Sequence, residues 1–166
     1  MSEKTISLSI KKILTLETTV FSLAFCVPLL FNGSQIVTGI IVNTLLFISA
    51  RRIEKNRQIF LAALPSLGSI SHGVLFGAFT IYLVYFLPFI WIGNYFLMRI
   101  AKSSNFLIAA LTKSTFLFLI AYVFVSLHIV PKIFLTAMGV LQLVTALVGG
   151  IFAIGISKYL LKSAHE

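Results

Sequence analysis

A single lysine interrupts the most apolar stretch of the chain, NFLIAALTKSTFLFLIAYVFV at residues 105–125. A charge at the middle of a membrane helix costs roughly 2.5–3.5 kcal/mol on insertion scales, so such a residue usually serves a function. Lys113 lies roughly 12 Å along a helix that starts after Asn105. Its ammonium can extend back to the headgroups along its own stem, or it can face the interior of a bundle and bind a solute. The interior position requires an anionic group or several amides as partners.

Amide side chains occur at comparable depths in other apolar segments. Gln35, Gly39 and Asn43 follow at four-residue steps and therefore share one helix face. Gln142 belongs to a stripe of small residues that also contains Gly139, Ala146, Gly150, Ala153 and Ser157. The glycines and alanines of this stripe are typical of ordinary helix packing in membranes. An unpaired amide at that depth is costly and needs a partner, so Gln142 is a candidate for contact with a solute.

Two further segments carry polar residues at membrane depth. LPSLGSISHG, ending at Gly73, combines a proline, two glycines, three serines and His72, a composition that is tolerated where backbone is buried in protein or lines a cavity. His72 can be a hydrogen-bonded packing residue or a ligand contact. Trp91 and Asn94 share a face beyond Pro88. The predicted solute-binding residues are Gln35, Asn43, His72, Trp91, Asn94, Lys113 and Gln142.

The composition is that of an integral membrane protein. Of 166 residues, 59% are hydrophobic and 10% are charged, whereas soluble domains are nearer half apolar and a quarter charged. Six crossings of about 20 residues each would use most of the chain. We therefore expect a single membrane domain over residues 1–166, with no soluble domain. The 16 phenylalanines suggest aromatic contacts with the solute.

Few residues are available for catalysis. The acidic residues are Glu3, Glu17, Glu54 and Glu166 alone, which excludes most carboxylate chemistry and most metal sites. The single cysteine, Cys26, cannot form an internal disulfide or hold an iron–sulfur cluster. The sequence has no GxxxxGK[ST] phosphate loop for ATP hydrolysis and no basic stretch suited to nucleic acid. We expect a protein that is not an enzyme and that holds no cofactor or metal.

The apolar runs predict an all-α polytopic bundle of six transmembrane helices. The spans are expected at about 16–31, 35–50, 59–77, 79–98, 106–127 and 133–157, with a turn near Gly77 between the third and the fourth. The N-terminal segment, through Leu14, has no small-x-small cleavage site after its apolar run and is expected to remain as an amphipathic lead-in.

The distribution of basic residues predicts the orientation. With the N-terminus in the cytoplasm, eleven of the 13 Lys and Arg residues fall on the cytoplasmic side, Lys132 falls outside, and Lys113 lies within the membrane. Cytoplasmic loops accumulate Lys and Arg, so this split supports six spans with both termini inside. The net charge of +9 is then a topology signal.

Several segments, taken in order, resemble the substrate-binding S components of energy-coupling factor transporters, which are six-helix membrane proteins of about this size. The resemblance covers nearly the whole chain and is carried by GSQIVTGIIVN, LPSLGSISHGVLFG, FLPFIWIGN, ALTKSTFLF and AMGVLQLVTALVGGIFA. These segments resemble an uncharacterised branch of that family that is sometimes labelled "iron hydrogenase". One cysteine and four acids make iron chemistry implausible for this sequence.

The resemblance implies uptake of a small vitamin- or cofactor-like solute across the plasma membrane of a prokaryote. The partners it implies are a membrane coupling protein and two cytoplasmic ATPase subunits. The docking helix of such proteins presents an Ala-x-x-x-Ala face, and the nearest match here is Ser22 with Cys26. The loop FNGSQ, at 31–35, would close the solute site.

A structural role is the alternative to transport. The chain could anchor or assemble a larger membrane complex, with its polar residues satisfying one another and leaving no cavity. The transport hypothesis predicts instead that amides and Lys113 from different helices surround a common polar chamber.

Overall fold

Helices form all the regular structure in the residues that the computed structural model describes, 3–31, 34–72 and 77–162. Side chains are described within these ranges except at 3–15, 72, 77–79 and 160–162. The elements are α1 (Glu3–Leu30), α2 (Gln35–Arg52), α3 (Lys55–His72), the 3-10 helix η1 (Gly77–Tyr82), α4 (Leu83–Ser103), α5 (Phe106–Ser126), α6 (Ile133–Met138) and α7 (Val140–Lys162). The all-helical prediction is confirmed for these residues.

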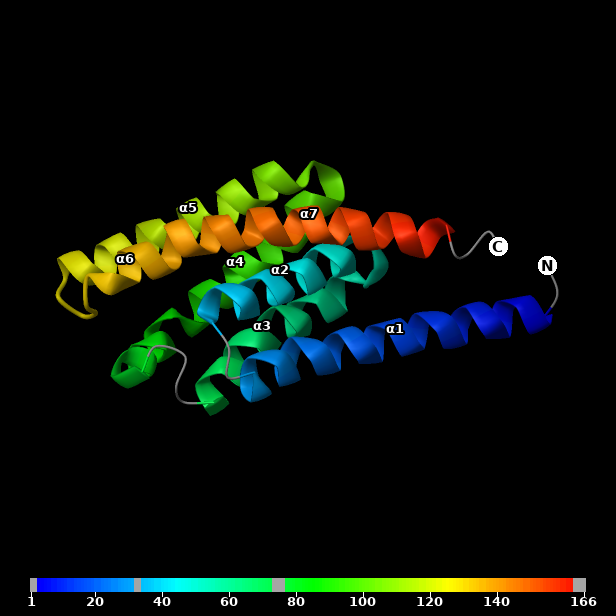
Figure 1. The fold of residues 1–166 in the computed structure, drawn as a ribbon, viewed down its shortest axis with the longest axis horizontal. Coiled ribbons are helices and arrows are strands. Elements are labelled where there is room, and N and C mark those ends of the chain that lie inside the picture. The colour runs from blue at the N-terminus through cyan, green and yellow to red at the C-terminus, as the bar shows by residue number, and fades with distance from the viewer. Residues whose placement is uncertain (1–2, 32–33, 73–76, 163–166) are drawn as a thin grey trace.

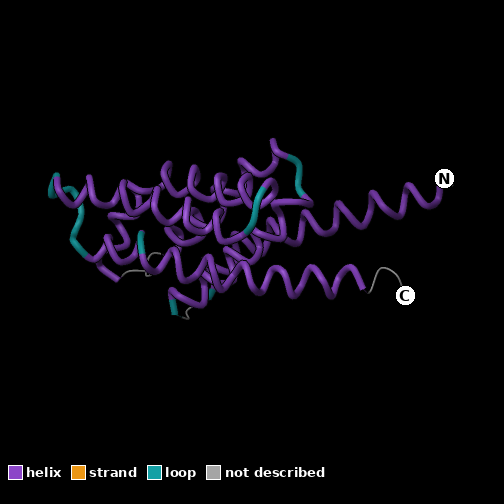
Figure 2. Tube along the Cα trace, turned by 90° about the horizontal axis from the view of Figure 1, so that it is seen from above, coloured by secondary structure: helices purple, strands orange, loops and turns teal. Residues whose placement is uncertain are grey.

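The helices run along one axis in alternate directions, with α6 and α7 forming the last pass (Figure 1). Both ends of the chain lie at the same end of the bundle, and the connections are short (Figure 2). We call this the terminal end; the α2–α3 and α4–α5 connections lie there too. The α1–α2 and α5–α6 connections lie at the opposite end. Short connections of this kind make sequential helices antiparallel neighbours.

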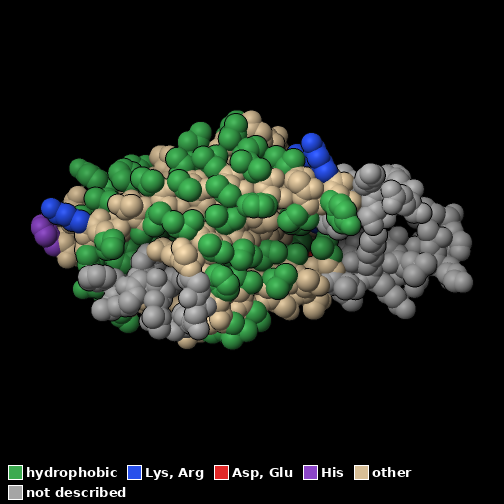
Figure 3. All heavy atoms as spheres, viewed as in Figure 1, with side chains coloured by type: hydrophobic (Ala, Val, Ile, Leu, Met, Phe, Trp, Pro, Cys, Tyr) green, Lys and Arg blue, Asp and Glu red, His purple; other side chains and the backbone are tan. Residues whose placement is uncertain are grey.

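Three segments among the described residues are long and apolar enough to cross a membrane: Thr80–Ser103, Phe106–Ser126 and Ile133–Tyr159. Leu16–Leu30 is a shorter apolar helix within α1. Exposed large apolar side chains cover the middle of the bundle, whereas Lys and Arg lie toward its two ends (Figure 3). This surface is compatible with a membrane protein, because lipid tails are as apolar as these side chains.

The helix α2 is the central element of the bundle. It contacts α1, α3, α4 and α7, and every residue from 42 to 50 is buried. Asn43, Thr44 and Ser49 are among these buried residues. A helix enclosed by other helices does not need an apolar surface toward lipid, so it can carry polar side chains that a lipid-facing helix could not.

The α2–α3 connection is stabilised from within the bundle. Gln58 is fully buried, and its Nε2 donates to the backbone oxygens of Ile53 at 2.9 Å and Ala50 at 3.1 Å. The last carbonyls of a helix have no partner within it, so the Gln58 amide satisfies groups that the turn leaves open. Arg57 pairs with Glu17 and so joins the start of α3 to α1.

The helices follow the predicted spans in order along the chain, with two differences. The third segment, predicted at 59–77, begins earlier, because α3 covers Lys55–His72, and its predicted residues 73–76 lie outside the described residues. The last segment, predicted as one helix over 133–157, is interrupted at Gly139, where the backbone φ of −99° and ψ of −89° is not helical. That a membrane encloses all six predicted spans remains a prediction.

Close backbone contact joins α2 to α7. A Cβ added to Gly149 would lie 2.9 Å from both Asn43 Cβ and Thr44 N. Real Cβ atoms almost never come that close to other atoms, so only glycine allows this approach. Gly155, two turns further along α7, has no atom within 4 Å of such a Cβ.

We therefore predict that Gly149→Ala lowers the free energy of unfolding by about 1–3 kcal/mol, the usual cost of overpacking. Gly155→Ala is the matched control on the same helix and should be neutral or slightly stabilising. Denaturant unfolding in detergent measures both. Equal stability of the two variants would contradict the close α2–α7 packing.

Candidate functional site

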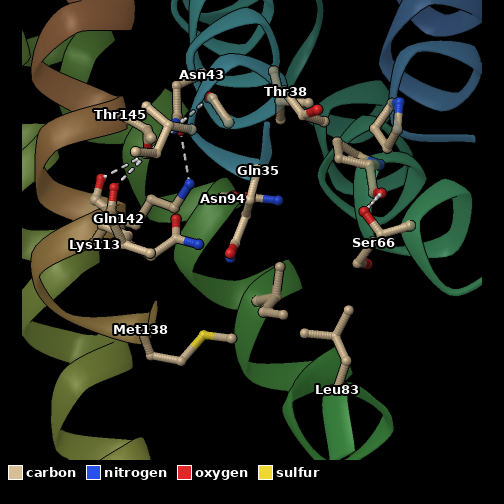
Figure 4. Close-up of a pocket in the computed structure, with 18 residues that line it drawn as sticks. Gln35, Thr38, Asn43, Ser66, Leu83, Asn94, Lys113, Met138, Gln142 and Thr145 are labelled. Carbon is tan, nitrogen blue, oxygen red and sulfur yellow. Dashed lines mark hydrogen bonds between the residues drawn. The ribbon is translucent and has the colours of Figure 1, made fainter. Parts of the chain in front are cut away.

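A cavity of about 90 Å³, lined by both apolar and polar side chains, lies inside the bundle. Its wall comes from α1, α2, α3, α4, α5, α6 and α7. The polar side chains of the lining are Gln35, Thr38, Asn43, Ser66, Ser69, Asn94, Lys113, Gln142 and Thr145. Figure 4 shows Lys113 and Gln142 directed toward a central space in which Gln35 and Asn94 also lie. A polar cavity of this size can hold several water molecules or a small solute.

The cavity lies between two apolar clusters. Val42 belongs to the cluster toward the terminal end, while Leu83, Ile90 and Met138 belong to the cluster at the opposite end. The lining is drawn from the parts of α2, α4 and α7 that begin at the opposite end, away from the basic residues of the α2–α3 and α4–α5 connections. The site is therefore displaced from the middle of the bundle toward its less basic end.

Lys113 is the charged group of the site. Its side chain is 3% exposed, and its Nζ donates to Asn43 Oδ1 at 2.7 Å. Asn43 Nδ2 in turn donates to Gly39 O at 2.9 Å and to Thr145 Oγ1 at 3.1 Å. Of the two positions open to Lys113 from the sequence, the structure has the interior one. The network joins α5, α2 and α7 through one buried amide.

The charge of Lys113 has no acidic partner among the described side chains. Glu17 pairs with Arg57, and Glu54 is exposed beside the terminal-end connection. The ammonium carries three N–H donors, and Asn43 is its one hydrogen-bond partner within the described part of the chain. Buried charges are normally paired, so this one is only partly compensated by the protein.

Two buried oxygen atoms in the lining have no partner among the described residues. Asn94 is 2% exposed; its Nδ2 donates to Ala62 O at 2.9 Å, whereas its Oδ1 is unpaired. Thr38 is 4% exposed, and its Oγ1 is also unpaired. Most buried polar atoms in proteins are hydrogen-bonded, so exceptions that share one cavity point to water or a ligand there.

The two glutamines connect the cavity to the surface. Gln35 and Gln142 are half-buried, and their side chains make no hydrogen bond within the described residues. Ile36, beside Gln35 at the start of α2, lines the cavity and is 41% exposed. The cavity therefore extends toward the α1–α2 connection. The predicted closing loop is there, but Asn32 and Gly33 lie outside the described residues.

Of the predicted site residues, Trp91 lies outside the lining and His72 has no described side chain. Trp91 is not part of the lining; its Nε1 donates to Ser66 Oγ at 2.7 Å, and Ser66 lines the cavity. Trp91 can therefore position the wall of the site but does not contact its contents. His72 ends α3, and its side chain lies outside the described residues.

The sequence prediction missed Thr38 and Thr145. Both follow a predicted site residue by three positions, Gln35 on α2 and Gln142 on α7. Residues at that spacing share a helix face, which is the signal that could have found them. Ser and Thr hydroxyls are common in helices because they can donate to a backbone carbonyl one turn earlier. Spacing alone is therefore weak evidence that a threonine belongs to a binding site.

The phenylalanines pack against one another. Phe86 and Phe134 are fully buried and stack with their ring centroids 5.2 Å apart. Phe124 contacts Phe86 at the same centroid distance. The described lining contains no aromatic side chain. The described phenylalanines therefore supply packing between helices, at the end opposite the termini and also at the terminal end, where Phe47 contacts Phe106.

The predicted docking pair lies on α1. Ser22 is exposed and Cys26 is half-buried, so this face is not fully covered by the bundle. Its use as a docking surface remains a prediction. No group of three His, Cys, Asp or Glu residues that could hold a metal ion occurs among the described side chains.

Comparison of the chain with protein-family models, with curated proteins and with solved structures finds no match.

The Lys113–Asn43 contact leads to a prediction about stability. Asn43→Leu leaves the buried ammonium without its acceptor and should cost about 3–5 kcal/mol of unfolding free energy. Adding Lys113→Met removes the stranded charge, so the double variant should recover the wild-type value or exceed it by about 1–4 kcal/mol. Denaturant unfolding of the ligand-free protein, analysed as a double-mutant cycle, measures this coupling. Additive losses would show that the two side chains do not interact.

Proposed function

We propose that the protein is the solute-binding membrane subunit of an uptake transporter, energised by a separate coupling protein and ATPases. The observation that carries the proposal is the polar cavity, in which a partly compensated ammonium and unpaired amide and hydroxyl oxygens meet inside an apolar bundle. A protein with a purely structural role would gain stability by filling such a space with apolar side chains. A cavity lined by polar and charged side chains at this depth is typical of a binding site.

In this proposal the bundle crosses the plasma membrane of a prokaryote six times, with both termini in the cytoplasm. Both termini share one end of the bundle, together with the α2–α3 and α4–α5 connections that carry Arg51, Lys55 and Lys102. The positive-inside rule then places that end in the cytoplasm. The cavity is displaced toward the other end, so solute enters it from outside the cell.

The size of the cavity sets a requirement on the mechanism. Pockets that enclose drug-sized ligands measure about 300–1,000 Å³, well above the 90 Å³ observed. A solute as large as a vitamin therefore has to displace part of the wall. The wall nearest the surface is the start of α2, where Gln35 and Ile36 lie beside the α1–α2 connection. Displacement of Gln35 and Ile36 at the start of α2 admits the solute.

The driving energy comes from partners, because the sequence has no phosphate loop with which to hydrolyse ATP. A coupling protein in the membrane links the subunit to two cytoplasmic ATPases and docks on the α1 face that presents Ser22 and Cys26. Small side chains on a membrane helix allow such close approach of a second helix.

The direct test of solute binding is to purify the protein with its lipids and identify co-purified small molecules by mass spectrometry. We expect one organic compound in near-stoichiometric amount, and the same compound should raise the thermal midpoint when added to the emptied protein. Recovery of no compound, together with no thermal shift across a vitamin panel, would contradict the proposal. Uptake of the compound should also stop in cells that lack the shared ATPases.

The topology has its own test. In a Cys26→Ser background, Lys132→Cys should react with a membrane-impermeant maleimide added to intact cells, because the α5–α6 connection lies outside. Ser103→Cys, exposed at the end of α4, should react only after the cells are opened. Gel-shift labelling measures both. The reverse pattern would invert the proposed orientation and place the cavity on the cytoplasmic side.

A further inference from the structure

The cavity presents two kinds of unused hydrogen-bonding capacity. On one side, Lys113 offers N–H donors beyond the one that Asn43 accepts. On the other, Asn94 and Thr38 offer oxygen atoms without partners. Lys113 belongs to α5, Asn94 to α4 and Thr38 to α2, and all three line the same space. A ligand that satisfies both kinds must carry an anionic acceptor and a neutral donor.

The polarity of the Asn94 amide is fixed by its surroundings. Its Nδ2 donates to Ala62 O at 2.9 Å, a backbone carbonyl that can only accept. The opposite assignment would place Oδ1 against that carbonyl oxygen and leave both unsatisfied. Oδ1 is therefore the atom left without a partner in the lining, and it accepts a hydrogen bond from whatever occupies the cavity.

The sign of the ligand charge follows from the charges around it. Among the described side chains, Lys113 is the charged member of the lining, and no acid stands near it. An anion is attracted to this ammonium at low dielectric, whereas a second cation is repelled. The donor for Asn94 is therefore a neutral hydroxyl or amide N–H, since an ammonium would be placed beside Lys113.

Resting on the solute-binding function proposed above, we infer that the solute is a small hydroxy carboxylic acid, or carries one as its head group. Its carboxylate accepts from Lys113 Nζ, and its hydroxyl donates to Asn94 Oδ1. Charge-assisted hydrogen bonds of this kind are the stronger ones, so the carboxylate supplies most of the affinity. The 90 Å³ of the cavity suits a head group of a few heavy atoms.

Three compounds of one size test the inference: lactate, propionate and lactamide. Propionate lacks the hydroxyl, and lactamide lacks the charge. Titration of the purified, solute-free protein, followed by thermal shift and calorimetry, gives the dissociation constant for each. We expect lactate to bind, propionate to bind about tenfold more weakly, and lactamide to bind more weakly still or not at all. This comparison uses the wild-type protein and does not depend on a variant that folds.

Variants then assign the contacts. Lys113→Gln keeps an N–H donor for Asn43 but removes the charge, and it should weaken lactate about tenfold or more. Asn94→Leu should weaken lactate to the level of propionate while leaving propionate itself unchanged. Lys102→Gln, an exposed lysine at the terminal end, is the matched control and should bind lactate as the wild type does.

The inference is overturned if lactate fails to bind, if lactamide binds as well as lactate, or if Lys113→Gln binds lactate unchanged. The inference about a hydroxy acid can fail in this way while the proposed function remains supported. That outcome requires that a solute without an acid group co-purifies with the protein and is imported. If no solute co-purifies and none is imported, the proposed function fails on its own test, independently of the three test compounds.

Discussion

The buried ammonium of Lys113 is the constraint on which the interior of this protein depends. A charge enclosed by apolar helices is tolerated only where other groups solvate it. Here Asn43 accepts from it at 2.7 Å, and Thr145 accepts from Asn43, so that one chain of hydrogen bonds holds α5, α2 and α7 together. Because these contacts use only part of the capacity of the ammonium, the protein is left with an electropositive site facing an open space.

The position of α2 makes this arrangement possible. Its residues 42–50 are buried by neighbouring helices, so its polar side chains face protein and cavity rather than lipid. Gly149 of α7 brings the two backbones close enough for Asn43 to reach Thr145. Apolar clusters lie on either side of the polar layer and confine it to one level of the bundle. The site is thus a product of helix packing and does not require a loop to form it.

Hydropathy and helical spacing predicted most of this fold and part of the site. Asn43, His72, Lys113 and Gln142 were expected near one depth, and the three of these whose side chains are described line one cavity, together with Gln35 and Asn94. Spacing gives the face of a helix on which a residue lies, but not which neighbour that face meets. For this reason the hydrogen bond from Trp91 to Ser66 could not be predicted. The helix break at Gly139 depends on local backbone conformation, and the sequence analysis did not predict it. The size of the cavity depends on how all seven helices pack, which no single segment encodes.

Accessibility of the chamber to water from outside the cell is the most direct measure of the central claim. In a Cys26→Ser background, Gln142→Cys places a thiol in the lining while Lys113 and Asn43 remain intact. A small hydrophilic thiosulfonate added to intact cells should modify this thiol, and the modification should slow when the transported solute is present. A thiol that stays unmodified in intact cells and in opened membranes alike would show a closed, filled interior and contradict a solute site.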